Sequence, residues 1–263
     1  IWSDPHVCRE YSWGLSDVAC GRDERHGKRS AFSDLYCRGL HVPFHPLFSR
    51  ATVCGAAMAI LDLACRHEVG PFALEGVLKI HRPQLIYLSG ENGCGKSTLL
   101  KIIAGHLHPG QGHLRIGSNL LLDTTRGINI KPEYRGVAWQ SQEDSLFPHV
   151  SLEKNVSWWH RYPRGMELAQ RLETEPYLDR LPGQLSGGQR ALGLLARTLA
   201  TPYEVVLLDE PLASLDDAKH ELALRVIQSE VQRGRTIVMI VHHPERYESV
   251  VTLPRSLFKI ELN

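Results

Sequence analysis

The glycine-rich stretch Gly90–Thr98 restricts the possible folds of this chain more than any other feature. It reads Gly-Glu-Asn-Gly-Cys-Gly-Lys-Ser-Thr and follows the apolar run Leu85–Leu88. The pattern GxxxxGK[ST] between a buried strand and a helix is typical of phosphate-binding loops. Glycines let successive backbone N–H groups face an anion at the start of a helix. The stretch therefore predicts an α/β fold that binds a nucleoside triphosphate.

The whole loop is expected to surround the phosphates, with different tasks for its backbone and side chains. Lys96 is long enough to reach the β and γ phosphates, and the Ser97 hydroxyl is a suitable ligand for Mg²⁺. The candidate nucleotide-binding residues here are Gly90, Glu91, Asn92, Gly93, Cys94, Gly95, Lys96, Ser97 and Thr98.

A pair of adjacent carboxylates follows a second apolar run, Val205–Leu208. Adjacent residues at the end of a strand point in different directions, so the two can serve different tasks. Asp209 suits the role of a metal ligand. Glu210 suits the role of a general base that polarises an attacking water. Together with the phosphate loop, this pair predicts a P-loop ATPase.

Strand-like and helix-like segments alternate after residue 58, which is typical of an α/β fold with a mostly parallel sheet. Expected strands are 85–88, 113–116, 137–139, 205–208 and 236–241, and an opening strand begins near Met58. Expected helices are 97–104, 186–200 and 217–233. The apolar periodicity predicts these inward-facing residues: Leu192, Leu195 and Leu199 on the second helix, and Leu224, Ile227 and Val231 on the third.

Residues 1–57 lack the apolar periodicity found in the rest of the chain. The segment 20–30 is highly charged, and 41–50 carries two prolines. We expect 1–57 to be an extension without a fold of its own, with Met58 as the natural start and 58–263 as the folded domain. A genuine but divergent N-terminal appendage is the alternative.

Composition excludes several other classes of protein. The chain has 263 residues and a formal net charge of +1, so its charge gives no reason to expect a nucleic-acid partner. No apolar run approaches the roughly 18 residues that a membrane-spanning helix requires. The histidines are scattered, and the cysteines form no CxxC motif. Cys94 lies inside the phosphate loop, which favours a reducing, cytosolic setting.

The segment Leu185-Ser186-Gly187-Gly188-Gln189 matches the signature sequence of ABC ATPases, and it indicates the family. Chemically it is similar to the phosphate loop, because Ser186 can cap a helix whose first-turn glycines expose N–H groups. The resemblance implies that Ser186, Gly187, Gly188 and Gln189 close over the ATP of a second cassette. It also implies a helical subdomain at about 143–190 and a head-to-tail homodimer.

Three further positions resemble motifs of the same family. Gln142, six residues before Pro148, resembles the glutamine that contacts Mg²⁺ and the attacking water, although Gln140 lies two residues away. Asp216 resembles the aspartate of the loop that runs between paired cassettes. His242 resembles the switch histidine that contacts the γ phosphate.

The chain departs from the family pattern at three places around these motifs. Val241 and His243 replace the residues that usually flank the switch histidine. The aromatic residue that stacks on adenine is not obvious, with His67 and Phe72 as candidates. The choice of ATP as the nucleotide therefore follows from the resemblance. The resemblance also implies that Glu210, His242 and Gln142 are the catalytic residues. The Mg²⁺ ligands that it implies are Ser97, Gln142 and Asp209.

The sequence of the stretch 123–149 is similar to that of ATP subunits of molybdate importers and, less closely, of other oxyanion importers. The resemblance implies a peripheral subunit on the cytoplasmic face of the cell membrane, attached to integral membrane permease subunits. Phe147 is expected to contact that partner, whereas Trp158 and Trp159 fit either a contact or the interior of the insertion. Import of another small solute, and a soluble ABC ATPase with a non-membrane partner, remain alternatives.

Overall fold

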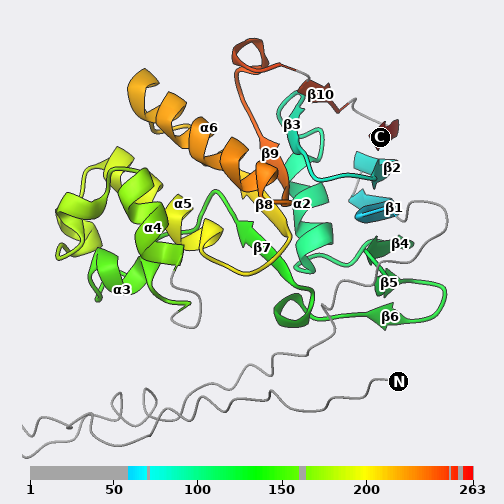
Figure 1. The fold of residues 1–263 in the computed structure, drawn as a ribbon. Helices are drawn as coiled ribbons and strands as arrows, with labels where there is room; N and C mark the ends of the chain where they lie inside the picture. The colour runs from blue at the N-terminus through cyan, green and yellow to red at the C-terminus, as the bar shows by residue number, and fades with distance from the viewer. Residues whose placement is uncertain (1–58, 70–71, 160–163, 249, 254–256, 263) are drawn as a thin grey trace, which may run out of the picture. The chain divides into compact units, whose positions relative to one another are not determined.

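The computed structural model describes residues 59–69, 72–159, 164–248, 250–253 and 257–262 (Figure 1). The expected extension 1–57 and the proposed start at Met58 lie outside this range. The strands are β1 (Leu61–Val69), β2 (Phe72–Ile80), β3 (Leu85–Ser89), β4 (Gln111–Ile116), β5 (Asn119–Asp123), β6 (Ile128–Asn129), β7 (Val137–Gln140), β8 (Val205–Asp209), β9 (Thr236–Ile240), β10 (Val250–Thr252) and β11 (Leu257–Leu262). The α-helices are α2 (Lys96–Ala104), α3 (Leu152–Val156), α4 (Arg164–Arg171), α5 (Gly187–Leu199) and α6 (Asp217–Gln232), and the 3-10 turns are η1 (Pro132–Tyr134), η2 (Glu175–Tyr177), η3 (Pro182–Gln184) and η4 (Pro244–Arg246).

A parallel sheet of five strands in the order β10-β3-β9-β8-β7 lies at the centre of the domain. Its strands are apolar throughout because both faces are covered. Along β8, Val205 and Leu207 join one hydrophobic cluster, which includes α2. Val206 and Leu208 join a second cluster, which includes α5 and α6. The predicted parallel sheet and its doubly buried strands are confirmed.

A second sheet has the order β11-β2-β1-β4-β5-β6 and is largely antiparallel. Only its β11–β2 pair is parallel. One face of β1 enters the first cluster through Leu61, Leu63 and Cys65. The sequence indicated the opening strand of this sheet and the strand around 113–116, but it did not indicate that they form a separate antiparallel layer.

The three predicted helices are confirmed to within one residue at each end. The inward face of α5 is also as predicted, since Leu192, Leu195 and Leu199 are buried. On α6 the prediction was partly wrong. Ile227 is buried, but Leu224 and Val231 are only partly buried, and the centre of the inner face is formed by Ala223, Val226 and Glu230.

Helices α3 and α4 both pack against α5, beside the parallel sheet (Figure 1). Leu152 and Val156 of α3 and Leu168 of α4 are fully buried in the second cluster. These elements, between residues 152 and 171, form the helical part of the domain. Within the described residues, no helix combines the length and apolar character that crossing a membrane would need.

Candidate nucleotide-binding and catalytic site

The phosphate loop connects β3 to α2, as its motif predicts. Gly95 precedes the helix with a φ of 102°, a left-handed conformation that glycine adopts without strain. Gly90 is required for a second reason. A Cβ atom there would lie 2.8 Å from both the Cys94 sulfur and the Leu253 carbonyl oxygen. The close approach of these backbone segments therefore depends on glycine.

Lys96 is directed back over the loop that it follows. Its Nζ atom donates hydrogen bonds to the carbonyl oxygens of Gly90, at 2.7 Å, and Glu91, at 3.1 Å. Lys96 is itself buried, so its charge lies against the loop rather than in solvent. A lysine ammonium beside such a loop is the group that contacts phosphate oxygens in proteins with a phosphate loop.

The carboxyl ends of β3, β8 and β9 lie side by side because these strands are parallel neighbours. The phosphate loop follows β3, Asp209 and Glu210 lie at the end of β8, and His242 follows β9. In open α/β sheets, this edge is where ligands bind. The topology therefore brings together motifs that are more than 100 residues apart in the chain.

Two of the predicted catalytic side chains converge on the carboxylate of the third. His242 Nε2 lies 2.6 Å from Glu210 Oε2. Gln142 Nε2 donates a hydrogen bond of 3.4 Å to the same oxygen. A carboxylate between an imidazole and an amide is suited to hold and orient a water molecule.

The backbone at Glu210 adopts a φ of 53°, which is unusual for a residue with a side chain. Such a conformation costs on the order of 1 kcal/mol and is found more often at functional sites than elsewhere. The two adjacent carboxylates have different partners: Glu210 contacts Gln142 and His242, whereas Asp209 accepts a hydrogen bond from Ser97.

Asp209 is only 4% exposed, and its environment fits a metal ligand. Burial raises the pKa of its carboxyl above the usual value, while a hydrogen bond from Ser97 opposes this rise. The other carboxylate oxygen, Oδ1, is buried and has no hydrogen-bond partner among the residues that the structure describes. An unsatisfied buried carboxylate oxygen beside a serine hydroxyl is the type of donor set that binds Mg²⁺.

The two neighbouring glutamines have different environments, which supports the choice of Gln142. Gln140 is buried at the end of β7, and its amide oxygen accepts a hydrogen bond from Thr198. Gln142 is exposed and reaches Glu210.

The sequence departs from the family pattern at the two residues that flank His242. Val241 is buried in the second cluster, and His243 points outward and pairs with Glu245. His67 is half-buried on β1, and the Phe72 side chain lies outside the described residues.

The predicted signature residues form the start of α5. Ser186 caps this helix by accepting a hydrogen bond from the Gln189 N–H, and the Gln189 amide oxygen accepts one from the Ser186 N–H. Gly187 and Gly188 form the first turn. A Cβ at Gly187 would meet no atom within 4 Å, so this glycine faces open space. Asp216 caps α6 in a similar way, accepting hydrogen bonds from the N–H and ammonium groups of Lys219.

An aromatic groove of about 240 Å³ lies between the helical part and the parallel sheet. The Phe147 ring packs against Trp158, at 4.7 Å between centroids, and beneath the Arg197 guanidinium, at 4.6 Å. Trp158 is 46% exposed, whereas Phe147 and Trp159 are partly buried. Trp159 also contacts Tyr203 edge-on. The aromatic residues therefore pack on one another and still leave one ring open to a partner.

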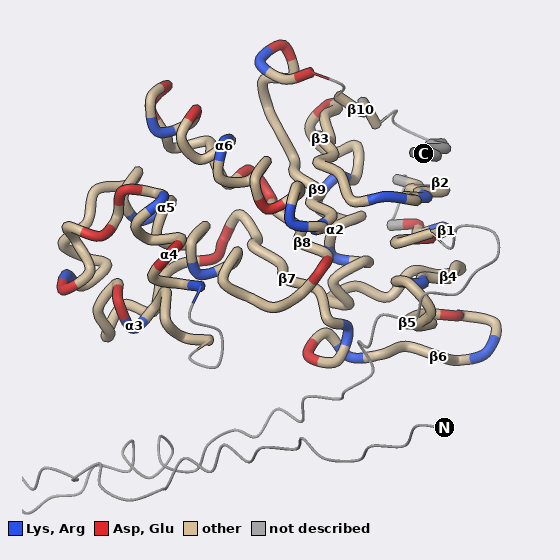
Figure 2. Tube along the Cα trace, in the orientation of Figure 1, with Lys and Arg blue, Asp and Glu red and all other residues tan. Residues whose placement is uncertain are grey.

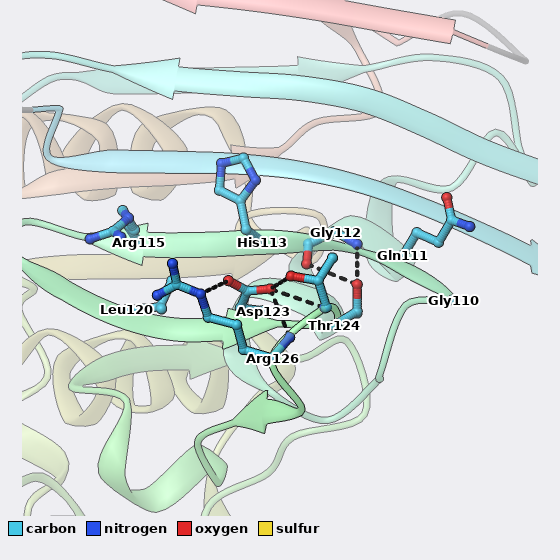
Figure 3. Close-up of a pocket in the computed structure, with 10 residues that line it drawn as sticks. Gly110, Gln111, Gly112, His113, Arg115, Leu120, Asp123, Thr124 and Arg126 are labelled. Carbon is cyan, nitrogen blue, oxygen red and sulfur yellow. Dashed lines mark hydrogen bonds and ion pairs between the residues drawn. The ribbon is translucent and has the colours of Figure 1, made fainter.

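A second hollow, of about 620 Å³, lies on the antiparallel sheet and contains none of the predicted site residues (Figure 3). Gln111, His113 and Asp123 are among its lining residues. Asp123 accepts hydrogen bonds from Thr125 and pairs with Arg126, and these contacts lower the pKa of its carboxyl. The Asp123 carboxylate is thus paired with neighbouring residues of its own turn.

Comparison with known proteins identifies relatives of the domain. The ABC transporter family profile matches residues 76–213. The molybdenum import ATP-binding protein ModC of Mycobacterium tuberculosis is 37% identical over 194 residues, which is 69% of this chain and 53% of that protein. The thiamine import ATP-binding protein ThiQ of Vibrio parahaemolyticus is 36% identical over 63% of this chain and 73% of its own length. The chain thus spans about half the length of the molybdenum import proteins it matches.

Solved structures agree with this assignment at the level of the fold. A nucleotide-free ATP-binding cassette from an ABC transporter aligns with a TM-score of 0.64 and 19% identity, over 76% of this chain and 89% of that one. An ATP-binding subunit of an ABC transporter aligns with a TM-score of 0.61 and 22% identity, over 75% and 87%. Together with the family profile and the relatives above 30% identity, this fold shows that the chain belongs to the ABC transporter family and carries its ATP-binding cassette.

Proposed function

We propose that this protein hydrolyses ATP as one half of a head-to-tail pair of cassettes and thereby drives a membrane transporter. The observation that carries the proposal is the convergence of His242 and Gln142 on the Glu210 carboxylate, at the sheet edge that also bears the phosphate loop. Family membership supports ATP as the nucleotide. Its test is release of phosphate from ATP by the purified chain, compared with a Glu210→Gln variant.

The residues of one chain would divide the chemistry between them. Backbone N–H groups of 90–98 and the Lys96 ammonium hold the phosphates. Glu210 accepts a proton from the attacking water as it approaches the γ phosphorus, and the bond between the γ phosphorus and the β–γ bridging oxygen breaks. His242, which already lies beside Glu210, orients the water and the γ phosphate.

Mg²⁺ fits the oxygen atoms present at this site. Asp209, Ser97 and Gln142 would hold it, with the unpartnered Asp209 Oδ1 as the strongest ligand. When bound, the ion neutralises charge on the β and γ phosphates.

The second chain would complete the site with the start of its α5. Ser186, Gly187 and Gly188 offer hydroxyl and N–H groups at a helix N-terminus, which attracts phosphate. Gln189 stabilises the start of α5 through its hydrogen bonds with Ser186. Asp216 lies at the start of α6, in the loop that runs between paired cassettes in the ABC family. Binding of ATP favours the closed pair, and its hydrolysis allows the pair to reopen.

Replacing Lys96 with alanine is expected to weaken the binding of ATP by at least about tenfold, because a buried charge that faces the phosphates is lost. Equilibrium binding of a fluorescent ATP analogue measures the effect. Lys131→Ala removes a lysine that is exposed on the surface, and it serves as the control. Equal affinities of the two variants would contradict the assignment of the loop.

The aromatic groove is proposed as the contact with an integral membrane permease. An exposed tryptophan beside an arginine and further rings is typical of the centre of a protein interface. Trp158→Ala is therefore expected to reduce the amount of membrane protein that co-purifies with the chain at least about fivefold. Met166→Ala, which truncates another exposed apolar residue, is the control, and a thermal unfolding curve tests whether both variants are folded. Undiminished co-purification of Trp158→Ala would contradict this contact.

Import of a small solute, with molybdate or another oxyanion as the leading candidate, is proposed from the similarity to molybdenum and thiamine import ATP-binding proteins. The chain would then be peripheral, on the cytoplasmic face of the membrane. The second candidate is an ABC ATPase with a soluble partner. A pull-down from solubilised membranes with Glu210→Gln and ATP separates the two, because co-purification of a multi-helix permease supports transport and capture of soluble proteins alone contradicts it.

A further inference from the structure

A fully buried carboxylate on α6 lies among four arginine side chains from two segments of the chain, α4 and the turn that follows α6. Glu230 is 0% exposed. Its Oε2 atom lies 2.5 Å from Arg164 and 3.4 Å from Arg235, and its Oε1 atom lies 3.2 Å from Arg233 and 3.6 Å from Arg171. Both oxygens are thus shared between arginines of different elements. None of these residues belongs to the site described above.

The cluster joins the helical part of the domain to the core. Arg164 and Arg171 are the two ends of α4, which packs on α5. Glu230 lies on α6, which packs on the parallel sheet strand β9. Arg171 also bonds to Ser229, and Glu167 of α4 pairs with Arg233 at 2.7 Å. Figure 2 shows acidic and basic residues interspersed along both helices.

Arg235 extends the connection to the end of the signature helix. It donates a hydrogen bond of 2.6 Å to the carbonyl oxygen of Leu199, the last residue of α5, and another to Thr201. The Leu199 carbonyl is one of those that a helix leaves unpaired at its C-terminus, and Thr201 lies just beyond that end. Burial lowers the pKa of the Arg235 guanidinium to about 10, and the Glu230 charge opposes that change. Glu230 therefore compensates the buried charge of Arg235 and helps to hold this side chain at the end of α5.

The ion pairs around Glu230 fix the relative positions of the helices more than they add to the stability of the domain. Buried ion pairs often contribute little net stability, because desolvation offsets their attraction, but removing one partner leaves charges uncompensated. Four arginines against Glu230 and Glu167 leave an excess of positive charge, so loss of Glu230 would make the arginines repel one another. Loss of Glu230 would weaken the attachment of α4 to α6 and, through Arg235, that of the C-terminus of α5.

We propose that Glu230 is a positioning residue for ATP hydrolysis, which sets the orientation of α5, and with it Ser186, Gly187 and Gly188, relative to the catalytic core. The inference rests on the proposed function, because these three residues act on the ATP of the other chain. Glu230 touches no phosphate-loop residue in any of its ion pairs. Its loss should therefore affect the closed pair and not the binding of ATP to one chain.

The test compares the full-length Glu230→Gln variant with the wild type. We expect kcat for ATP hydrolysis to fall about tenfold, because charge-assisted hydrogen bonds that hold the helices are lost. The dissociation constant of nucleotide from the single chain should stay within about twofold. Glu230→Asp keeps the charge and should restore part of kcat. Glu221→Gln neutralises an exposed glutamate of the same helix and is the matched control.

Two results would overturn the inference while the proposed function stands. One is a kcat of Glu230→Gln equal to that of the active wild type. The other is a parallel loss of kcat and nucleotide affinity, since it indicates general destabilisation. If Glu230→Gln does not fold, Arg164→Gln makes the same comparison, because three arginines still face Glu230 in that variant. A wild type that does not hydrolyse ATP would overturn the proposed function, and the inference with it.

Discussion

Glu210→Gln is expected to bind ATP with unchanged affinity and to hydrolyse it about 10²- to 10⁴-fold more slowly than the wild type. The amide keeps the size and shape of the side chain and can still contact His242 and Gln142, but it cannot accept a proton from water. The backbone at residue 210, with its φ of 53°, remains accessible to glutamine as it is to glutamate. Phosphate release under saturating ATP and equilibrium nucleotide binding are the two measurements.

A matched variant separates the role of Glu210 from the loss of any negative charge. Glu133 is exposed on η1, outside the site, and Glu133→Gln should hydrolyse ATP at the wild-type rate. Turnover by Glu210→Gln at the wild-type rate would rule out Glu210 as the base. Loss of nucleotide binding in that variant would instead assign Glu210 a role in holding the phosphates.

The candidate phosphate-binding residues could be proposed from the sequence because their motifs depend only on local spacing. A phosphate loop, a strand that ends in Asp-Glu and a capped Gly-Gly helix start each need only a few consecutive residues. The distance between Gln142 and Glu210 could not be predicted in this way, since it depends on how β7 and β8 pair. The sequence also gave no physical reason to prefer Gln142 to Gln140. The burial of Gln140 against Thr198 supplies one.

Long-range pairing explains what the sequence did not indicate about the fold. The core strands β8 and β9 are apolar on both faces, so their sequences alone predict a sheet covered on both sides. Strand β11 pairs with β2 over a separation of about 180 residues, and nothing in either segment indicates that partner. Glu230 is a similar case. A glutamate near the end of a helix normally faces water, and only the arginines from α4 and Arg235 explain why this one is buried.

A second buried charge attaches the antiparallel sheet to the phosphate-loop helix. Arg135 is only 1% exposed, and its guanidinium donates hydrogen bonds to the carbonyl oxygens of Ile102, at 2.7 Å, and Ile103, at 2.9 Å. Both lie in the last turn of α2, where a positive charge interacts favourably with the helix dipole. The same side chain also bonds to Ile130 and to the amide oxygen of Asn129. Burial lowers the pKa of Arg135 to about 10.

The glycine that follows α2 allows this contact. Gly105 has a φ of 93°, and a Cβ atom there would lie 2.5 Å from Arg135 Nε. The guanidinium therefore lies close to the end of α2, and a larger residue at position 105 would exclude it. Because α2 begins with Lys96, anything that shifts its C-terminal turn also shifts the helix that positions the phosphate loop.

Arg135→Met is accordingly expected to lower the free energy of unfolding by about 3 kcal/mol, since methionine fills part of the space but leaves buried carbonyls without donors. For a domain of this size the thermal midpoint should fall by roughly 10 °C. Arg126→Met is the control. Arg126 is 67% exposed and, among the described residues, pairs with Asp123 in the surface turn, so its loss should change the free energy by less than about 0.5 kcal/mol. Equal midpoints for the two variants would mean that the carbonyls at the end of α2 find other donors, and that Arg135 does not fix this helix to the antiparallel sheet.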